Sequence, residues 1–461
     1  MTTMQALRQP APAFERLASF WAETRFAGIP PAVADFAALL ILDLIGVAAA
    51  ATRMQAGLIA RNHAVMHWAA GPGAPNARLL FDGRRTSLPG AAFALATQLD
   101  NLDAHDGWQP SKGHAGAALF PTLAALADAR GDVSGQEAIV AMILGYEIAY
   151  RASAALHATT ADYHTSGAWN ALGCATITAR LRGMTRDQLR HALGIAEFHA
   201  PRSQMMREIA NPTMLHDGTS WGAPTGIASA LMAEAGFTGA PAALVEFDDA
   251  AGIWADLGQR WLTTEQYIKN YPVCRWAHAP IDAALALRAR HDIKPARVER
   301  VEISTFKYSA QLWNDIPTSS PVAQYALAWP VAAAIARGRV TVDEVLEASF
   351  SDAEIGGLVK ATQVTVDDKL EAAYPAQRLG RVVITLKTGE RFDSGVHEAS
   401  GGPVPAPTRA QVVAKYRAFA TPVLGETRTR RIEETVLALS SPGARFTDLL
   451  DLITPPVDCA P

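Results

Sequence analysis

The stretch FAALLILDLIGVAAAAT, residues 36–52, is the most apolar run in the chain. It is shorter than the roughly 20 residues that cross a bilayer and carries Asp43 in its interior, so it is predicted to be a buried helix. Around it, over residues 12–255, apolar residues recur at three- and four-residue intervals, with alanine at many positions between them. This pattern predicts that the first half of the chain is helical.

Capping boxes mark several expected helix starts, because a hydroxyl that bonds the amide three residues further on is paired there with Glu or Gln. The pairs are Ser134 with Glu137, Thr185 with Gln188, Thr341 with Glu344, and Thr408 with Gln411. Each pair is expected to open a helix.

After Pro280 the pattern changes to alternating apolar and polar residues, which is typical of strands. Strands are predicted at residues 298–306, 363–368 and 380–393, the last with a hairpin turn at Thr388-Gly389. Helices are expected between them at 322–337 and from Thr341. The Gly- and Pro-rich GGPVPAPT (401–408) then interrupts the chain before a final helical stretch.

The expected fold class is mainly α, with a large all-helical domain and a smaller α+β domain. A chain of 461 residues exceeds what one hydrophobic core usually holds, which also favours two domains. The boundaries are placed at residues 1–268 for the helical domain, 269–399 for the α+β domain, and 400–461 for a helical segment that returns to the first domain.

The bulk composition excludes some classes of function. A net charge of -4 argues against nucleic acid or an anionic membrane as a partner, since both require a concentrated basic face. The three cysteines, Cys174, Cys274 and Cys459, lie far apart and form no CxxC pair. The N-terminus carries no signal-peptide core. A reducing, cytoplasmic setting is expected.

The densest polar cluster is LDNLDAHDGWQPSKGHAG, residues 99–116. It holds Asp100, Asp103, His105, Asp106, Lys112 and His114. The apolar run that follows places His114 at the start of a helix, where the dipole and free amides favour an anion. Three interpretations stay open here: a solvated loop, a metal site like that of HD-type phosphohydrolases at His105-Asp106, and acid–base catalysis on an anionic substrate.

Three further segments carry candidate residues, although each alone is also compatible with a structural role. They supply His164 in residues 157–173, then Arg202, Arg207, His216 and Asp217 in 202–222, and Lys269, Arg275 and His278 in 267–285. The last segment falls where the two domains should meet, and domain junctions commonly bind ligands.

Taken together, these segments resemble the MmgE/PrpD family, which includes 2-methylcitrate dehydratases, cis-aconitate decarboxylases and iminodisuccinate epimerases. Asp103-Ala104-His105-Asp106-Gly107 followed by Gly113-His114-Ala115 resembles the family's D-x-D-D-[ST] stretch and G-H-[PA] turn. His164 and the turn His216-Asp217-Gly218 resemble two further motifs. Lys269, Pro272, Cys274 and His278 match K-x-[YFW]-P-x-C-x-x-x-H in step.

The resemblance implies a helical domain capped by an α+β lid, a homodimer, and an active site in the cleft between the domains with no metal or organic cofactor. It implies chemistry at a carbon next to a carboxylate of a di- or tricarboxylate, through a carbanion that fixed cations stabilise. The expected function is a lyase, either a dehydratase or a decarboxylase. The alternatives are an epimerase or isomerase of a dicarboxylate and a catalytically silent carboxylate-binding relative.

By resemblance, the catalytic residues are Asp103, which orients or tunes the site, and His114, His164 and His278, with His278 preferred for acid–base work. The expected substrate-binding residues are Asp106, Lys112, Arg207, His216, Lys269 and Arg275.

The chain departs from the family pattern at two substrate-contacting positions. Gly107 stands where the family usually has Thr or Ser, and Thr213 where it commonly has Lys. The lost cation is expected to be replaced by Lys112, Arg207 or Arg275. His105 likewise stands where the family often has an acid.

Overall fold

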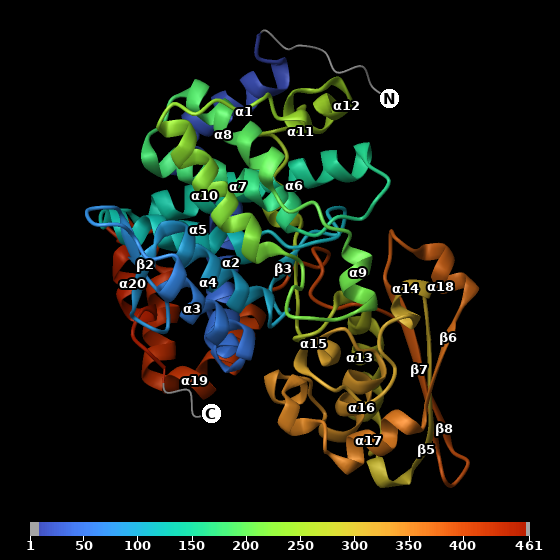
Figure 1. Ribbon diagram of the computed structural model, residues 1–461. Coiled ribbons are helices and arrows are strands. Elements are labelled where there is room, and N and C mark those ends of the chain that lie inside the picture. The colour runs from blue at the N-terminus through green and yellow to red at the C-terminus, as the bar shows by residue number, and fades with distance from the viewer. Residues whose placement is uncertain (1–8, 458–461) are drawn as a thin grey trace.

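The computed structural model describes residues 9–457, so Cys459 lies outside the described residues. Two parts are visible in Figure 1: a helical body and a smaller α+β lid, drawn yellow to orange. The C-terminal helices, drawn in red, lie beside the blue N-terminal helices of the body rather than with the lid. The expected class, mainly α with a smaller α+β domain, is confirmed.

The body is built almost entirely of helices. They are α1 (Pro12–Glu23), α2 (Pro31–Ala50), α3 (Gln55–His67), α4 (Leu88–Asp100), α5 (Gly116–Arg130), α6 (Gly135–Thr159), α7 (Gly167–Arg182), α8 (Arg186–His199), α9 (Met205–Ala210), α10 (Thr219–Glu234), α11 (Ala243–Glu246), α12 (Asp248–Ala251), α19 (Arg409–Leu437) and α20 (Phe446–Ile453). Helix α19 is broken at Gly425, whose φ is 74°. A short hairpin of β1 (Asn76–Arg78) and β2 (Arg85–Ser87), which the sequence did not predict, lies at the edge of the body.

The lid is a four-stranded sheet with helices packed on it. Its strands are β5 (Val298–Thr305), β6 (Thr362–Val366), β7 (Leu379–Leu386) and β8 (Arg391–Glu398), in the order β6-β5-β7-β8. Only the β5–β6 pair is parallel. The lid helices are α13 (His278–Arg290), α14 (Lys307–Ala310), α15 (Ser320–Gln324), α16 (Ala328–Arg337), α17 (Ala353–Lys360) and α18 (Asp368–Ala373). Figure 1 shows α13, α16 and α17 on one side of the sheet, where Ile303 and Val382 are fully buried partners.

Most of the local expectations hold, and the exceptions have clear causes. The turn at Thr388-Gly389 joins β7 to β8 with Gly389 at φ 86°. Reciprocal capping boxes form at Thr185, Thr341 and Thr408, although Thr341 opens only a 3₁₀ turn, Val342–Val345. At Ser134 only the hydroxyl takes part, because the Glu137 carboxylate binds Arg180 instead.

One expected helix, over residues 322–337, is divided in two by the structure. Helix α15 ends at Gln324 and α16 begins at Ala328, and the three residues between them bring Tyr325 to the domain junction.

Helix α2 contains most of the apolar run, residues 36–50. It and α6 are long and apolar enough to span a membrane by composition, but 89% and 94% of their apolar windows are buried within the fold. Asp43 is only 1% exposed inside α2, and its carboxylate forms a 2.6 Å ion pair with Lys415 of α19. The Lys415 ammonium also donates to the Ala104 carbonyl at 2.6 Å, so one side chain joins the C-terminal helix, the core and the 99–116 segment.

Replacing Lys415 with Met is expected to lower the free energy of unfolding by about 3–5 kcal/mol, because it leaves the Asp43 carboxylate buried without a counter-ion. Urea unfolding followed by circular dichroism measures this change. The double variant Asp43→Asn/Lys415→Met removes both charges and should recover most of the loss. A single variant within about 1 kcal/mol of the parent chain would contradict a structural role for the pair.

Candidate active site

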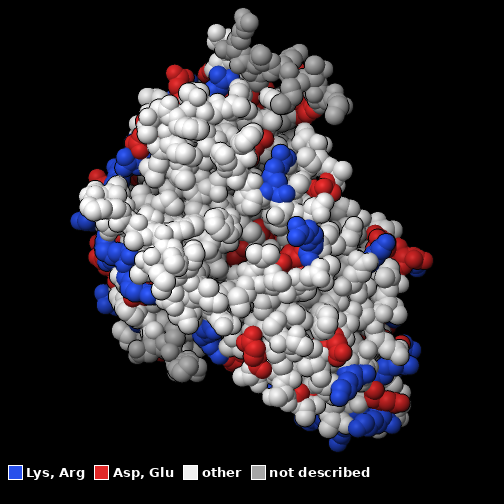
Figure 2. Space-filling model, viewed as in Figure 1, with Lys and Arg blue, Asp and Glu red and all other residues white. Residues whose placement is uncertain are grey.

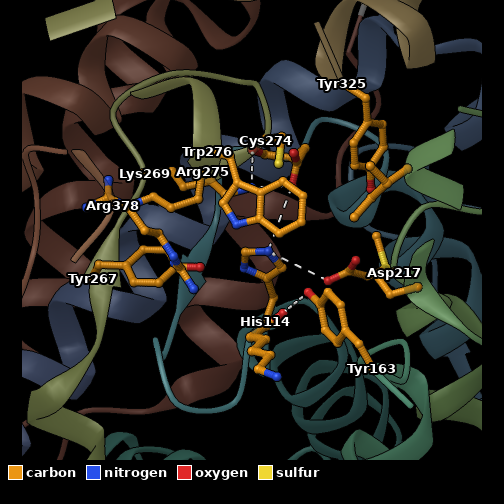
Figure 3. A pocket seen from close by; sticks show the side chains of 14 residues that line it. His114, Tyr163, Asp217, Tyr267, Lys269, Cys274, Arg275, Trp276, Tyr325 and Arg378 are labelled. Atoms are coloured by element: carbon orange, nitrogen blue, oxygen red, sulfur yellow. Dashed lines mark hydrogen bonds and ion pairs between the residues drawn. The ribbon is translucent and has the colours of Figure 1, made fainter. Parts of the chain in front are cut away.

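A pocket lies where the lid meets the body, and both parts line it (Figure 3). Figure 2 shows a hollow between the two parts with acidic and basic side chains at its rim. The lining residues are Asp103, Lys112, His114, Tyr163, Met205, Ile209, Asp217, Tyr267, Lys269, Cys274, Arg275, Trp276, Tyr325 and Arg378.

A two-residue antiparallel ladder holds the two main site segments together. Strand β3 (Asp106–Gly107) pairs with β4 (Tyr267–Ile268), with Asp106 opposite Ile268 and Gly107 opposite Tyr267. On its other side, the Ile268 amide donates to the Gly401 carbonyl at 2.9 Å. The 99–116 segment is thereby fixed against the segment that carries Lys269, as well as against the end of the lid.

Asp103 and Lys269 form a buried ion pair at the base of the pocket. The Lys269 ammonium donates to the Asp103 carbonyl at 3.0 Å and also to its carboxylate. Asp103 has a left-handed φ of 54°, which is uncommon for a residue with a side chain and brings both acceptors to one ammonium. Burial acts to lower the pKa of Lys269, but the adjacent Asp103 carboxylate outweighs it, and the net pKa lies above its usual range.

His114 is positioned as a neutral acceptor. Its Nδ1 lies 2.5 Å from the Asp106 carbonyl, which can only accept, so Nδ1 carries the hydrogen and Nε2 presents a lone pair. Burial, followed by the charge of Lys269, lowers the pKa of His114 well below its usual range. Nε2 lies 3.6 Å from the Asp217 carboxylate and 4.0 Å from that of Asp103.

Asp217 supplies the complementary group. Burial, reinforced by the Asp103 charge, raises the pKa of Asp217 to about 7, even though the Ser166 hydroxyl donates to its carboxylate at 2.9 Å. The same Ser166 hydroxyl accepts the His114 amide at 3.0 Å. Near neutral pH, the pocket therefore contains a carboxyl group able to donate a proton beside an imidazole able to accept one.

Asp106 does not line the pocket, so its predicted contact with substrate is corrected. It is fully buried, and its carboxylate accepts from the Tyr146 hydroxyl at 2.7 Å and the Gly116 amide at 3.1 Å. The amide at the start of α5, expected to bind a substrate anion, is thus occupied by a carboxylate of the chain itself. Asp106 acts as a structural group that also orients His114 through its carbonyl.

Four other predicted site residues also lie outside the pocket lining. His278 is fully buried, with the Arg275 guanidinium 3.4 Å from its Nδ1 and the Val273 carbonyl 3.2 Å from its Nε2. Its contacts therefore stabilise the turn at residues 273–277 instead of reaching the pocket. His216 packs against the Tyr325 ring at 5.5 Å, and it is its neighbour Asp217 that faces the pocket.

The remaining two are displaced outward. His164 forms an isolated β-bridge with Gln204 and does not line the pocket. Arg207 is exposed and lines a separate depression. The structure does bring together Asp103, His114, Lys112, Lys269 and Arg275.

The phosphohydrolase alternative required His105 and Asp106 to share a metal. His105 Nε2 instead lies 3.8 Å from Asp100, whereas Asp106 is engaged by tyrosine hydroxyls. Within residues 9–457, no three His, Cys, Asp or Glu side chains are arranged to hold a metal ion.

The two departures from the family pattern have local explanations. A Cβ atom at Gly107 would lie 2.4 Å from the Tyr267 hydroxyl and 2.8 Å from His114 Nδ1, so the tyrosine fills the space of a larger residue. The Thr213 hydroxyl binds the buried Glu208 carboxylate at 2.8 Å and serves a loop contact. Of the proposed replacement cations, Lys112 and Arg275 line the pocket.

The sequence did not single out Arg378, Tyr267, Tyr163 or Tyr325. Arg378 directly precedes β7 in a segment without any motif, and only its place at the domain junction could have indicated a role. Asp217 is among the candidates of its segment, but the family resemblance predicts a substrate contact for His216 beside it.

Fold and site together define a two-domain, mainly helical protein whose interdomain pocket holds a neutral histidine, a buried carboxyl group and several cations. The chain matches the MmgE/PrpD N-terminal domain over residues 15–257 and the MmgE/PrpD C-terminal domain over residues 271–441. It belongs to the MmgE/PrpD family.

Several relatives are named for one activity. A cis-aconitate decarboxylase of Aspergillus terreus is 25% identical over 411 residues, covering 80% of this chain and 81% of the relative. A cis-aconitate decarboxylase-like protein of Aspergillus oryzae is 22% identical, covering 80% and 83%. The cis-aconitate decarboxylase of Homo sapiens is 24% identical over 59% of this chain and 60% of its own.

Replacing Gly107 with Ala is expected to lower the free energy of unfolding by about 1–3 kcal/mol, since the new methyl group must displace the Tyr267 ring. Gly357→Ala is the matched control, because nothing lies within 4 Å of its Cβ position in α17, and its stability should stay level or rise by up to about 1 kcal/mol. Chemical denaturation measures both. Equal effects at the two positions would contradict the close contact.

Proposed function

We propose that this protein is a cofactor-free lyase acting at a carbon next to a carboxylate of a di- or tricarboxylate, with decarboxylation as the preferred reaction. The observation that carries the proposal is the buried Asp217 carboxyl 3.6 Å from His114 Nε2, in a pocket that four Lys and Arg side chains line. Burial raises the pKa of Asp217 to about 7, so this group can donate a proton near neutral pH. The names of the relatives support decarboxylation over dehydration.

The charges of the pocket favour a polyanionic ligand. Four Lys and Arg side chains line it, against the carboxyl groups of Asp103 and Asp217, and the pKa of Asp217 is raised to about 7. Lys269 is engaged by Asp103, and Arg275 donates to the carbonyls of Ala399 and Ser400. Lys112 and Arg378 form no ion pair with any residue that the structure describes, so they are free to meet carboxylates.

The proposed decarboxylation breaks the bond between a substrate carbon and its carboxylate, which leaves as CO2. The electron pair passes through the substrate to a carbon beside a second carboxylate, where fixed cations in a closed pocket stabilise the developing charge better than water does. Asp217 then gives its proton to that carbon and recovers one from solvent. In the dehydration variant, His114 Nε2 would first remove the proton next to the carboxylate, and Asp217 would protonate the departing hydroxyl.

We further propose that the protein acts as a homodimer in the cytoplasm. The family resemblance supports the dimer, and the absence of any paired cysteine among the described residues is compatible with a reducing compartment. Light scattering of the purified protein measures the oligomeric state directly.

Incubation with cis-aconitate and related polycarboxylates, followed by proton NMR and CO2 detection, should reveal loss of one carboxylate with equimolar CO2. The activity should survive prolonged dialysis against EDTA, because no step uses a metal. Water loss without CO2 would instead identify a dehydratase. Exchange into deuterated water without net change would identify an epimerase, and no turnover or exchange across the panel would favour a silent binding protein.

The rate should fall about tenfold per pH unit above pH 7, because Asp217, with a pKa of about 7, loses its proton there. Below that pH the rate should stay level, since the lowered pKa of His114 keeps the imidazole neutral. Asp217→Asn should reduce kcat by about 10²–10⁴-fold and abolish this alkaline limb.

The exposed Asp248→Asn serves as a matched control for the same pH profile. An Asp217→Asn variant that retained both the rate and the alkaline limb would show that another group donates the proton.

A further inference from the structure

Arg378 is a buried cation for which the described part of the chain supplies no counter-ion. Its side chain is 6% exposed, and its Nε lacks any hydrogen-bond partner within residues 9–457. Over the same residues, Arg378 forms no ion pair, in contrast to Lys269, which is held by Asp103. A buried donor without an acceptor is unfavourable, and the guanidinium also has no counter-charge among the described residues, so an anion from outside the chain is the simplest complement.

The surroundings direct this guanidinium toward the pocket. Arg378 lines the pocket wall, and its charge acts to lower the pKa of His114. In Figure 3, Arg378 and Tyr267 lie on one side of His114, and Asp217 lies on the other. A ligand that reached both Arg378 and Asp217 would therefore pass over the imidazole.

Contacts from the helical body hold the Arg378 segment in place. The Gln109 side-chain amide donates to the carbonyls of Pro375 and Ala376 at 2.8 and 2.5 Å. Gln109 belongs to the same segment as His114, so the lid cation and the imidazole are positioned by a common loop. Arg378 also lines a larger groove that runs along residues 398–414, which leaves it within reach of a ligand that enters from solvent.

We propose that Arg378 binds the carboxylate of the substrate that lies farthest from the carbon that reacts. This inference rests on the proposed function and adds one position to it: the carboxylate that leaves and the one beside the carbanion stay at the His114–Asp217 end, and the remote carboxylate lies at the lid. A guanidinium suits this role because its planar fork matches a carboxylate with two parallel hydrogen bonds. Arg378 would then determine specificity without taking part in proton transfer.

The test compares binding of tricarballylate, an unreactive saturated tricarboxylate, with methylsuccinate, which lacks one terminal carboxylate. Calorimetry on the full-length protein should show that tricarballylate binds about 10- to 150-fold more tightly, the range of one charge-assisted pair. Arg378→Met should abolish this preference, and Arg378→Lys should retain part of it. The exposed Arg207→Met is the matched control and should leave the preference unchanged.

The melting temperature of the free protein separates a binding role from a structural one. Because Arg378 is unpaired, Arg378→Met should melt at or above the temperature of the parent chain. A lower melting temperature, or an equal loss of affinity for both ligands, would overturn the proposal. Tight tricarballylate binding that Arg378→Met leaves intact would overturn this inference alone, whereas absence of binding to the parent chain would overturn the proposed function with it.

Discussion

The buried ion pair between Lys269 and Asp103 sets the electrostatics of the whole site. One ammonium takes both the carbonyl and the carboxylate of Asp103, and thereby ties the 99–116 segment of the body to the segment that opens the lid. Burial is the main cause that raises the pKa of Asp217 and lowers that of His114. The Asp103 charge adds to the first shift, and the Lys269 charge adds to the second. The pair therefore favours a protonated carboxyl beside a neutral imidazole, the arrangement from which acid–base chemistry follows.

Close contacts between backbone segments position the groups around this ion pair. The β3–β4 ladder places Tyr267 against Gly107, where no side chain fits. The Asp106 carboxylate accepts the Gly116 amide at the start of α5, and the Asp106 carbonyl fixes the tautomer of His114. Gly107 and Asp106 do not line the pocket, yet they determine which atoms face it. The proposed substrate contacts are those of the pocket cations and of the His114–Asp217 pair.

The sequence predicted the fold well because helical periodicity, alternation and capping pairs are local properties. It also located the site segments, since motif spacing carries over to this chain. It predicted only part of the set of side chains that face the pocket. His278 keeps its motif spacing from Lys269, yet the 3₁₀ turn Arg275–Ala277 directs it into the lid core. Asp217 faces the pocket while the adjacent His216, with a φ of 47°, does not. Arg378 reaches the site through tertiary structure alone.

A neutron crystal structure at pH 6 would test the central claim most directly, because it locates the hydrogens of the buried groups. The account predicts one hydrogen on the Asp217 carboxyl, one on His114 at Nδ1 only, and a fully protonated Lys269 against an ionised Asp103. A doubly protonated His114 facing an ionised Asp217 would contradict it, because the pocket would then hold an ion pair in place of a separate acid and base.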